Sequence, residues 1–542
     1  MMPQDNPHEP IYRRLAVGFL LLCMGMGLFT TGHYGMTWDE PFRFAGGDSK
    51  LDYYKGLLSG ETPDRQTSSY PGLFDLPLAL FHEQFPNLGT RSQKGHVYSF
   101  LFGMLGILSA WRLTARLGGE RAGLWALLFL ATLPRYYGHM FFNPKDIPLA
   151  GTYIFGLWAL VACFSRLPSV PWKYVVWIGV AGGLSMSTRI AGFLIFCYFG
   201  LFALIYVAAK YGVNLRSGQS VRSLPWLSDI KLWVLRGFAA GAIGFSILFL
   251  FWPTVHRNPF SGASQALETV QSYSWSGVVL MDGHFWEASN LPFYYIPYWI
   301  VYTTPEHILL LLALGMALGV ITVVSYGRSG LWPSACKWIP RSLIVFAWIF
   351  PLGYMLWKDP VIYDGLRHFL FVLPPMVCVA ALGFEWILRQ IERAGRPRFI
   401  VVLQAVMALA AGLVTIEMVR LHPYQYVYFN QISGGLPGAF GRDETDYWGL
   451  SHKEAAEWLN AHVEEIDPGG ERIFRVHQLY SFWMLQEHLN SSRFEVTAEP
   501  EGADFFVSMT RFNFHNSYPE ADLLHAVERK GIPLCFIFSL AE

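Results

Sequence analysis

Residues 143–165 read NPKDIPLAGTYIFGLWALVACFS, a charged tetrapeptide followed directly by 19 residues that carry no charge. An apolar run of about 20 residues is long enough to cross the hydrocarbon core of a membrane as a helix. Long apolar runs and short charged stretches alternate in this way from Tyr12 to Arg420, after which the composition resembles that of soluble proteins. The sequence therefore predicts an integral membrane protein with several spans.

The overall composition points the same way. Of the 542 residues, 53% are hydrophobic and 15% are charged, whereas soluble proteins carry about 25% charged residues. The formal net charge is zero, so there is no electrostatic reason to expect a nucleic-acid partner. About eleven runs match the length of a spanning helix. They cover residues 14–31, 96–115, 121–138, 147–165, 173–188, 190–209, 232–252, 305–325, 341–357, 367–386 and 399–419.

Basic residues occur in every second predicted loop, which is the pattern expected of loops on the cytoplasmic side. This pattern places the N-terminus inside. The predicted outer segments are then residues 32–95, 135–146, 253–304 and 358–366, and the tail from about 420. The inner loops carry Arg13, Arg14, Arg112, Arg116, Arg121, Arg166, Lys173, Lys210, Arg216, Arg222, Lys231, Arg328, Lys337, Arg341, Arg389, Arg393, Arg396 and Arg398.

We expect two domains, an all-α polytopic membrane domain over residues 1–419 and a small extracytoplasmic α/β tail domain over residues 420–542. In the tail, residues 452–463 have helical periodicity, and residues 472–476, 504–508 and 534–539 are short β-prone runs. The segment Leu291–Thr304 is rich in Tyr, Trp and Pro, and such aromatic residues favour the membrane–water interface. We expect this segment to lie on the outer surface.

The first outer loop opens with Thr37-Trp38-Asp39-Glu40. Adjacent carboxylates at the membrane surface can serve as a general base and its neighbour, or bind a metal ion. The alternative is an acidic cap on a helix near the interface, because acidic pairs are common on surfaces.

The second outer loop places His139, Asn143, Lys145 and Asp146 at the start of a span. Asp146 can be explained as a residue that stabilises the positive end of the helix. That explanation does not account for Lys145, because basic residues are disfavoured on this side of the membrane.

Two arginines lie at the outer ends of spans. Arg189 divides the apolar stretch from Lys173 to Lys210, which predicts a sharp hairpin, and Arg367-His368 begins the tenth span. Ionisable groups within apolar segments are costly and suggest a functional role. The alternative for Arg367 is a structural ion pair with Asp364.

Acids and cations thus gather on the predicted outer face. An enzyme that moves a sugar from a phospholipid carrier needs such a set. A carboxylate takes the proton of the acceptor hydroxyl, and cations stabilise the departing phosphate. Both must lie at headgroup depth, because the tail of the carrier stays in the bilayer.

These residues resemble membrane glycosyltransferases of the GT-C class, and most of all family 39, the protein O-mannosyltransferase and aminoarabinose-transferase type. The matching pieces are TWDEP at Thr37–Pro41, GHVYSFLFG at Gly95–Gly103, NPKDIPLA at Asn143–Ala150, the Arg189 hairpin and YDGLRHFLFVLPP at Tyr363–Pro375. The segment His422–Leu459 is similar to the region that follows the last span in bacterial members.

The resemblance implies a polyprenyl-phosphate-linked sugar donor and an inverting transfer on the extracytoplasmic face of a bacterial cytoplasmic membrane. It implies Asp39 as the general base with Glu40 in support, and Lys145, Arg189 and Arg367 on the phosphate side. Asp146 is then a second acid, and His139 and His368 are further substrate-binding candidates. A divalent metal is possible, since some relatives use one, but no clear ligand set is present. The tail lacks a recognisable sugar-binding repeat, so a glycan, a lipid and a protein all remain as acceptors.

Two other functions fit parts of the pattern. A transporter or flippase for a lipid-linked glycan would explain many spans and buried charges, although transporters often contain internal repeats and place charges near the midplane. A non-enzymatic envelope assembly protein would use the outer tail as its binding module.

Overall fold

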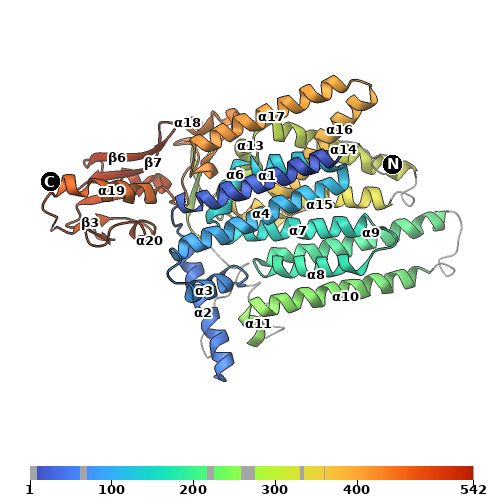
Figure 1. The fold of residues 1–542 in the computed structure, drawn as a ribbon, viewed down its shortest axis with the longest axis horizontal. Coiled ribbons are helices and arrows are strands. Elements are labelled where there is room, and N and C mark those ends of the chain that lie inside the picture. Colours follow the sequence, from blue (N-terminus) through green and yellow to red (C-terminus); the bar gives the residue numbers. More distant parts are fainter. Residues whose placement is uncertain are drawn as a thin grey trace.

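The computed structural model describes residues 9–61, 70–216, 225–257, 275–329, 335–358, 360–470 and 472–540. Long helices run alongside one another, and a small sheet with its helix lies at one end of them (Figure 1). Parts of the predicted outer segments 32–95 and 253–304, and the basic residue Arg222, lie outside the described residues.

The membrane part begins with α1 and extends to α17. Its elements are α1 Glu9–Thr30, η1 Thr31–His33, α2 Glu40–Ser59, α3 Asp75–Gln84, α4 Arg91–Gly118, α5 Glu120–Ala131, α6 Pro134–Phe142, α7 Asp146–Phe164, α8 Trp172–Met186, η2 Ile190–Phe193, α9 Leu194–Arg216, α10 Trp226–Phe251, α11 Pro253–Arg257, β1 Val278–Met281, β2 His284–Glu287, α13 Tyr295–Thr303, α14 Glu306–Ser329, α15 Ala335–Lys358, η5 Arg367–Val372, α16 Leu373–Arg393 and α17 Pro397–Arg420.

Within the described residues, eight helical segments are long and apolar enough to cross a membrane, and the chain is a multi-pass membrane protein. They correspond to eight of the eleven predicted spans. Two more predicted spans coincide with α8, which has 15 residues, and with α14, whose apolar stretch covers Glu306–Ile321.

The predicted span 121–138 differs, because it is not one helix. α5 ends at Ala131 and α6 begins at Pro134. Proline disfavours helical backbone in the residue before it, and Leu133 is extended, with φ −88° and ψ 103°. The break lets α6 carry His139 towards the end of the bundle that faces the tail.

Burial separates central helices from peripheral ones. In the most apolar window of α7, 89% of the residues are buried, against 17% in α17 and in the N-terminal span. Helices whose side chains stay exposed on an apolar face are suited to lipid contact. α7 therefore lies in the core, where it packs closely against α4.

Small residues make the close packing of α4 and α7 possible. A methyl group added to Gly151 on α7 would lie 2.2 Å from the carbonyl oxygen of Phe102 on α4. Close approach of helix backbones through small residues is a general way to pack membrane helices.

The tail folds around a five-stranded mixed sheet of order β4-β3-β5-β7-β6. β3 pairs in parallel with β4 and β5, whereas β7 pairs antiparallel with β5 and β6. The predicted helix and the three predicted strands are found as α19, β3, β5 and β7; β4 and β6 were not predicted. The tail elements are η6 Gln425–Val427, η7 Gln431–Ser433, α18 Gly435–Ala439, α19 His452–Ile466, β3 Phe474–His477, α20 Trp483–Gln486, β4 Phe494–Thr497, β5 Phe505–Met509, η8 Arg511–Asn516, β6 Asp522–Arg529 and β7 Ile532–Ser539.

The predicted interfacial segment Leu291–Thr304 contains the short helix α13. One face of α13 is buried against the protein, including Trp299, while Phe293 just before it is exposed. Part of the segment therefore packs against the rest of the protein, and part of it is exposed.

We expect Gly151→Ala to lower the free energy of unfolding of the membrane domain by about 1–3 kcal/mol, the usual cost of adding volume to a packed core. The measurement is thermal unfolding of the purified protein in detergent. Gly200→Ala on α9 is the matched control, because nothing lies within 4 Å of a methyl group there. It should be neutral or stabilising by up to about 1 kcal/mol. Equal melting temperatures for the two variants would contradict the close approach of α4 and α7.

Candidate active site

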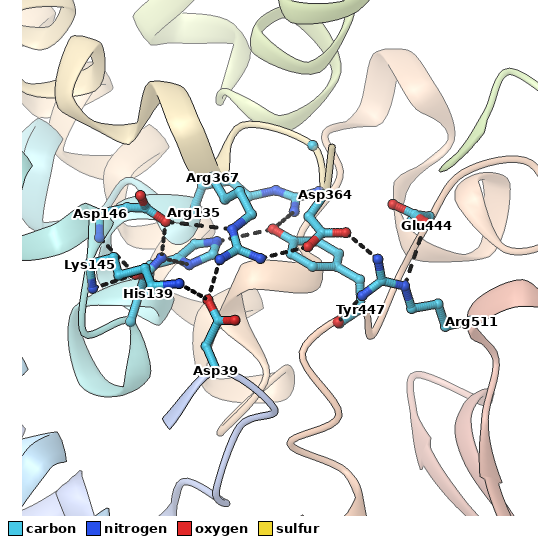
Figure 2. A network of polar contacts seen from close by, with 12 residues as sticks. Asp39, Arg135, His139, Lys145, Asp146, Asp364, Arg367, Glu444, Tyr447 and Arg511 are labelled. Atoms are coloured by element: carbon cyan, nitrogen blue, oxygen red, sulfur yellow. Dashed lines mark hydrogen bonds and ion pairs between the residues drawn. The ribbon is translucent and has the colours of Figure 1, made fainter. Parts of the chain in front are cut away.

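Four segments that are far apart in the sequence meet at the ends of the helices nearest the tail. Asp39 directly precedes α2, and Asp146 is the first residue of α7. Arg189 lies between α8 and η2, and Arg367 is the first residue of η5. Figure 2 shows Asp39, Lys145, Asp146 and Arg367 pointing towards one another. The predicted gathering of acids and cations at one end of the spans is therefore present in the structure.

Arg367 lies at the centre of this cluster, with its side chain 2% exposed. Its guanidinium faces three carboxylates. Nη2 pairs with Oδ2 of Asp39, Nη1 lies 2.7 Å from Oδ2 of Asp364, and Nε lies 3.6 Å from Oδ2 of Asp146. The guanidinium also lies 4.3 Å from the ring centre of Trp448. The planar fork of an arginine suits such multiple recognition of carboxylates.

Asp39 is shared between two cations. Besides Arg367, Nζ of Lys145 lies 3.3 Å from the same Oδ2 atom. Burial favours the neutral carboxyl, but Arg367 and Lys145 outweigh this effect and hold the pKa of Asp39 below its usual range. Asp39 is therefore ionised at neutral pH, and its side chain keeps 18% exposure to the surroundings.

Asp146 connects the cluster to the Arg189 hairpin. Nη1 of Arg189 lies 3.0 Å from Oδ1 of Asp146. The start of α7 is stabilised by Asn143, whose Oδ1 accepts hydrogen bonds from the backbone N–H groups of Lys145 at 3.2 Å and of Asp146 at 2.8 Å. Asn143 thus makes the local contacts of a cap, and the Asp146 carboxylate faces the cations.

Glu40 lies beside Asp39 in sequence but faces another way. Its Oε2 accepts hydrogen bonds from the backbone N–H of Thr37 at 2.7 Å and from the Thr37 hydroxyl at 2.9 Å. Its Oε1 lies 3.2 Å from Nε2 of His96. Glu40 therefore supports the turn that presents Asp39, and among the described residues its ion-pair partner is His96 instead of Arg367 or Lys145.

The two predicted histidines lie at the margin of the cluster. Nε2 of His139 is 3.1 Å from the Tyr447 hydroxyl. The ring of His368 packs edge-on against Tyr363, with 4.7 Å between ring centres. The structure therefore brings Asp39, Lys145, Asp146, Arg189 and Arg367 into one ionic network and leaves His139, His368 and Glu40 outside it.

Two charged residues extend the network towards the tail. Asp364, which the sequence suggested only as a structural partner of Arg367, is fully buried and also pairs through Oδ1 with Nη2 of Arg511. Arg511 begins η8 in the tail. Sequence reasoning missed Arg511, because a single arginine after a β-prone run carries no local signal of its partner.

Counted over ion pairs of 3.6 Å or shorter, the network has an excess of positive charge. It contains four cations, Arg189, Arg367, Lys145 and Arg511, and three carboxylates, Asp39, Asp146 and Asp364. Nearby, burial raises the pKa of Glu444 to about 8, although Arg511 acts in the opposite direction. This raised pKa weakens the negative charge that Glu444 contributes beside Arg511. Such a cluster is suited to an anion, because preorganised cations stabilise negative charge that develops during a reaction.

The expectation of a possible divalent metal stays a prediction. Across the described ranges, no group of three or more His, Cys, Asp or Glu side chains is placed so that it could hold a metal ion. The carboxylates described above are instead paired with arginine and lysine.

We expect Asp364→Asn to lower the free energy of unfolding by about 3–5 kcal/mol, the cost of breaking a buried ion pair, because it leaves Arg367 and Arg511 partly uncompensated. Asp364 has φ +60°, which Asn tolerates well, so the effect reports the lost charge. Thermal unfolding is the measurement. Asp282→Asn is the control, at an exposed position with φ +52°. A stability equal to that of this control would contradict the double pairing of Asp364.

Comparison with known families supports the resemblance. The family model of dolichyl-phosphate-mannose-protein mannosyltransferases matches residues 75–219. This stretch includes Lys145, Asp146 and Arg189, and the match confirms the resemblance to GT-C class membrane glycosyltransferases that the motifs indicate. No curated protein sequence matches the chain.

Several solved structures are similar to the chain. ArnT from Cupriavidus metallidurans in the apo state is 13% identical, with a TM-score of 0.46 and coverage of 97% of this chain and 98% of that one. The same protein bound to undecaprenyl phosphate is 14% identical, with a TM-score of 0.46 and the same coverage. The archaeal oligosaccharyltransferase AglB from Archaeoglobus fulgidus, in complex with an inhibitory peptide and a dolichol-phosphate, is 12% identical, with a TM-score of 0.48 and coverage of 93% and 70%.

Proposed function

We propose that this protein is a glycosyltransferase that moves a sugar from a polyprenyl-phosphate donor to an acceptor hydroxyl on the extracytoplasmic side of the membrane, with Asp39 as general base. The observation that carries the proposal is the contact of the Asp39 carboxylate with both Arg367 and Lys145 at the end of the helices. The family match over residues 75–219 supports the same reaction class. The acceptor is a glycan, a lipid or a protein.

The cations would hold the donor phosphate. Lys145, Arg189 and Arg367 all lie at or next to helix ends on the side of the tail, and none is placed in the middle of a span. A carrier whose hydrocarbon tail stays in the bilayer presents its phosphate at this depth. Charge-assisted hydrogen bonds from arginine and lysine are the strong contacts for such a group.

Transfer would follow a single displacement. Asp39 takes the proton from the acceptor hydroxyl, the acceptor oxygen forms a bond to the anomeric carbon, and the bond between that carbon and the phosphate oxygen breaks. The polyprenyl phosphate leaves with one more negative charge, which Arg367 and Lys145 stabilise. The proton on Asp39 then passes to water.

Donor binding would also activate the base. While Arg367 and Lys145 pair with Asp39, they hold its pKa below the usual range, and a weakly basic carboxylate is a poor proton acceptor. A phosphate that pairs with the same two cations competes with Asp39 for them. The pKa of Asp39 then rises towards its usual value, so the base gains strength when the donor is bound.

The location of the charges favours an enzyme over a transporter. Transporters place substrate and ion sites near the bilayer midplane. Here the network formed by Asp39, Asp146, Arg189 and Arg367 lies at helix ends, and it contacts the tail through Asp364 and Arg511. Release of free polyprenyl phosphate distinguishes the enzyme, whereas uptake of an intact lipid-linked glycan by vesicles would indicate a transporter.

We expect Asp39→Asn to reduce the rate of sugar transfer by about 10²–10⁴-fold, the usual contribution of a general base. The assay measures release of polyprenyl phosphate by the purified protein from a panel of polyprenyl-phosphate sugars. Binding of the donor should be retained or strengthened, because Arg367 and Lys145 lose a competing carboxylate.

The matched control for that experiment is Asp48→Asn. Asp48 lies in the same outer segment and pairs with Arg91 at 2.7 Å, away from the ionic network, so its variant should transfer sugar at the wild-type rate. Transfer by Asp39→Asn at the rate of this control would show that Asp39 is not the base.

We expect Lys145→Gln to raise the KM for the donor by roughly 10–100-fold, since a hydrogen bond to a charged group is worth about 1.5–3 kcal/mol. The KM for the acceptor should change much less. Lys55→Gln is the control, because Lys55 pairs with Glu83 in an exposed position. An unchanged donor KM for Lys145→Gln would remove Lys145 from the phosphate site.

A further inference from the structure

The tail contributes one charged side chain directly to the ionic network. Arg511, the first residue of η8, is 3% exposed although it belongs to a domain that follows the last span. Its Nη2 pairs with Asp364, and its Nη1 donates a hydrogen bond of 2.9 Å to the backbone carbonyl of Tyr447. Figure 2 shows Arg511 reaching from the tail ribbon towards Asp364.

Asp364 is divided between two arginines. Arg511 takes Oδ1, and Arg367 takes Oδ2 through its Nη1 atom at 2.7 Å. The remaining Nη2 of Arg367 is thereby directed to Asp39. A chain of ion pairs thus runs from the tail to the proposed base: Arg511, Asp364, Arg367, Asp39.

Arg511 also contacts the residue that precedes the base. Its guanidinium lies 3.9 Å from the ring centre of Trp38 and 4.7 Å from that of Phe512. A cation over an aromatic face is attracted to it, by about 2 kcal/mol or more when both are desolvated. The tail therefore restrains both the backbone segment that carries Asp39 and the carboxylate that orients Arg367.

Removal of Arg511 would change the charge balance of the network. Without it, three cations would face three carboxylates. Asp364 would then offer both oxygens to Arg367, which would draw the guanidinium away from Asp39. Glu444 competes weakly for Arg511, because its Oε1 lies 4.0 Å from Nε and burial raises its pKa.

We propose that Arg511 is a positioning residue: by neutralising Asp364 from the tail side and packing on Trp38, it keeps Arg367 turned towards Asp39 and the donor phosphate. The tail domain in this way completes the site instead of only covering it. The inference rests on the proposed function, because it assigns Arg511 a role in that same reaction.

The test compares Arg511→Gln with Arg511→Lys and wild type in the release of polyprenyl phosphate. Arg511→Gln should raise the donor KM by about tenfold, the order expected when a buried charge-assisted contact is lost. Arg511→Lys should raise the donor KM less, because lysine keeps the positive charge but lacks the planar guanidinium group. Arg493→Gln is the control: Arg493 is also buried in the tail and pairs with Glu464 and Asp467 at 2.9 and 3.0 Å, with no contact to the network.

The pH profile supplies a readout that a merely structural role would not move. The charged groups that pair with Asp39 are Arg367 and Lys145, and the ring of His368 also interacts with its charge. If Arg367 turns to Asp364 in Arg511→Gln, the pKa of Asp39 in the free protein rises, and the acid limb of kcat/KM moves to higher pH. The same limb should stay in place for Arg493→Gln.

Each outcome decides the question. Arg511→Gln with the donor KM and acid limb of the Arg493→Gln control would overturn the inference. If Arg511→Gln does not fold, Arg511→Lys with wild-type donor KM and pH profile would overturn it instead. If the wild-type protein transfers no sugar, the proposed function fails, and the binding of undecaprenyl phosphate is measured instead. Weaker binding by Arg511→Gln than by Arg493→Gln supports the positioning role. Equal binding by the two variants, or no binding, overturns it.

Discussion

The burial of the Arg367 guanidinium is the constraint on which the rest of the site depends. Arginine stays protonated in proteins, so a side chain that is 2% exposed must be compensated by carboxylates, or its burial costs several kcal/mol. Asp39, Asp146 and Asp364 supply that compensation from three separate segments. One buried cation therefore connects the segment before α2, the start of α7 and the segment before η5.

The location of this cluster follows from the membrane. A charged group in the hydrocarbon core is costly, and backbone there must be satisfied by helices. Ionic chemistry is consequently confined to the ends of the spans. The tail then shields those ends, and Asp39 keeps limited access at 18% exposure. A site of this kind combines strong electrostatic contacts with an opening for substrates.

For Arg367, the structural explanation of a buried ion pair and the functional explanation of a substrate-binding cation are compatible. The ion pair between Arg367 and Asp364, which the sequence offered as the alternative to a functional role, is present, yet Arg367 also contacts Asp39. Glu40 does not fit the alternative of an acidic helix cap at the surface, because it is buried and contacts Thr37 and His96, while no side chain caps the start of α2. The role of Asp39 as base remains a proposal.

Hydrophobic length and the alternation of basic loops are local properties, and they were enough to predict most spans and to place Asp39, Lys145, Asp146, Arg189 and Arg367 at one end of the helices. The periodicity of the tail likewise predicted α19 and three strands. The break before Pro134 was hidden in a continuous apolar run.

Only the tertiary structure decided which acids meet which cations, that Glu40 turns to Thr37 and His96, and that Arg511 contacts Asp364 from 147 residues away. The physical reason is that the sequence gives the type and position of each side chain, whereas the electrostatic partner of that side chain depends on how distant helices and the tail pack together.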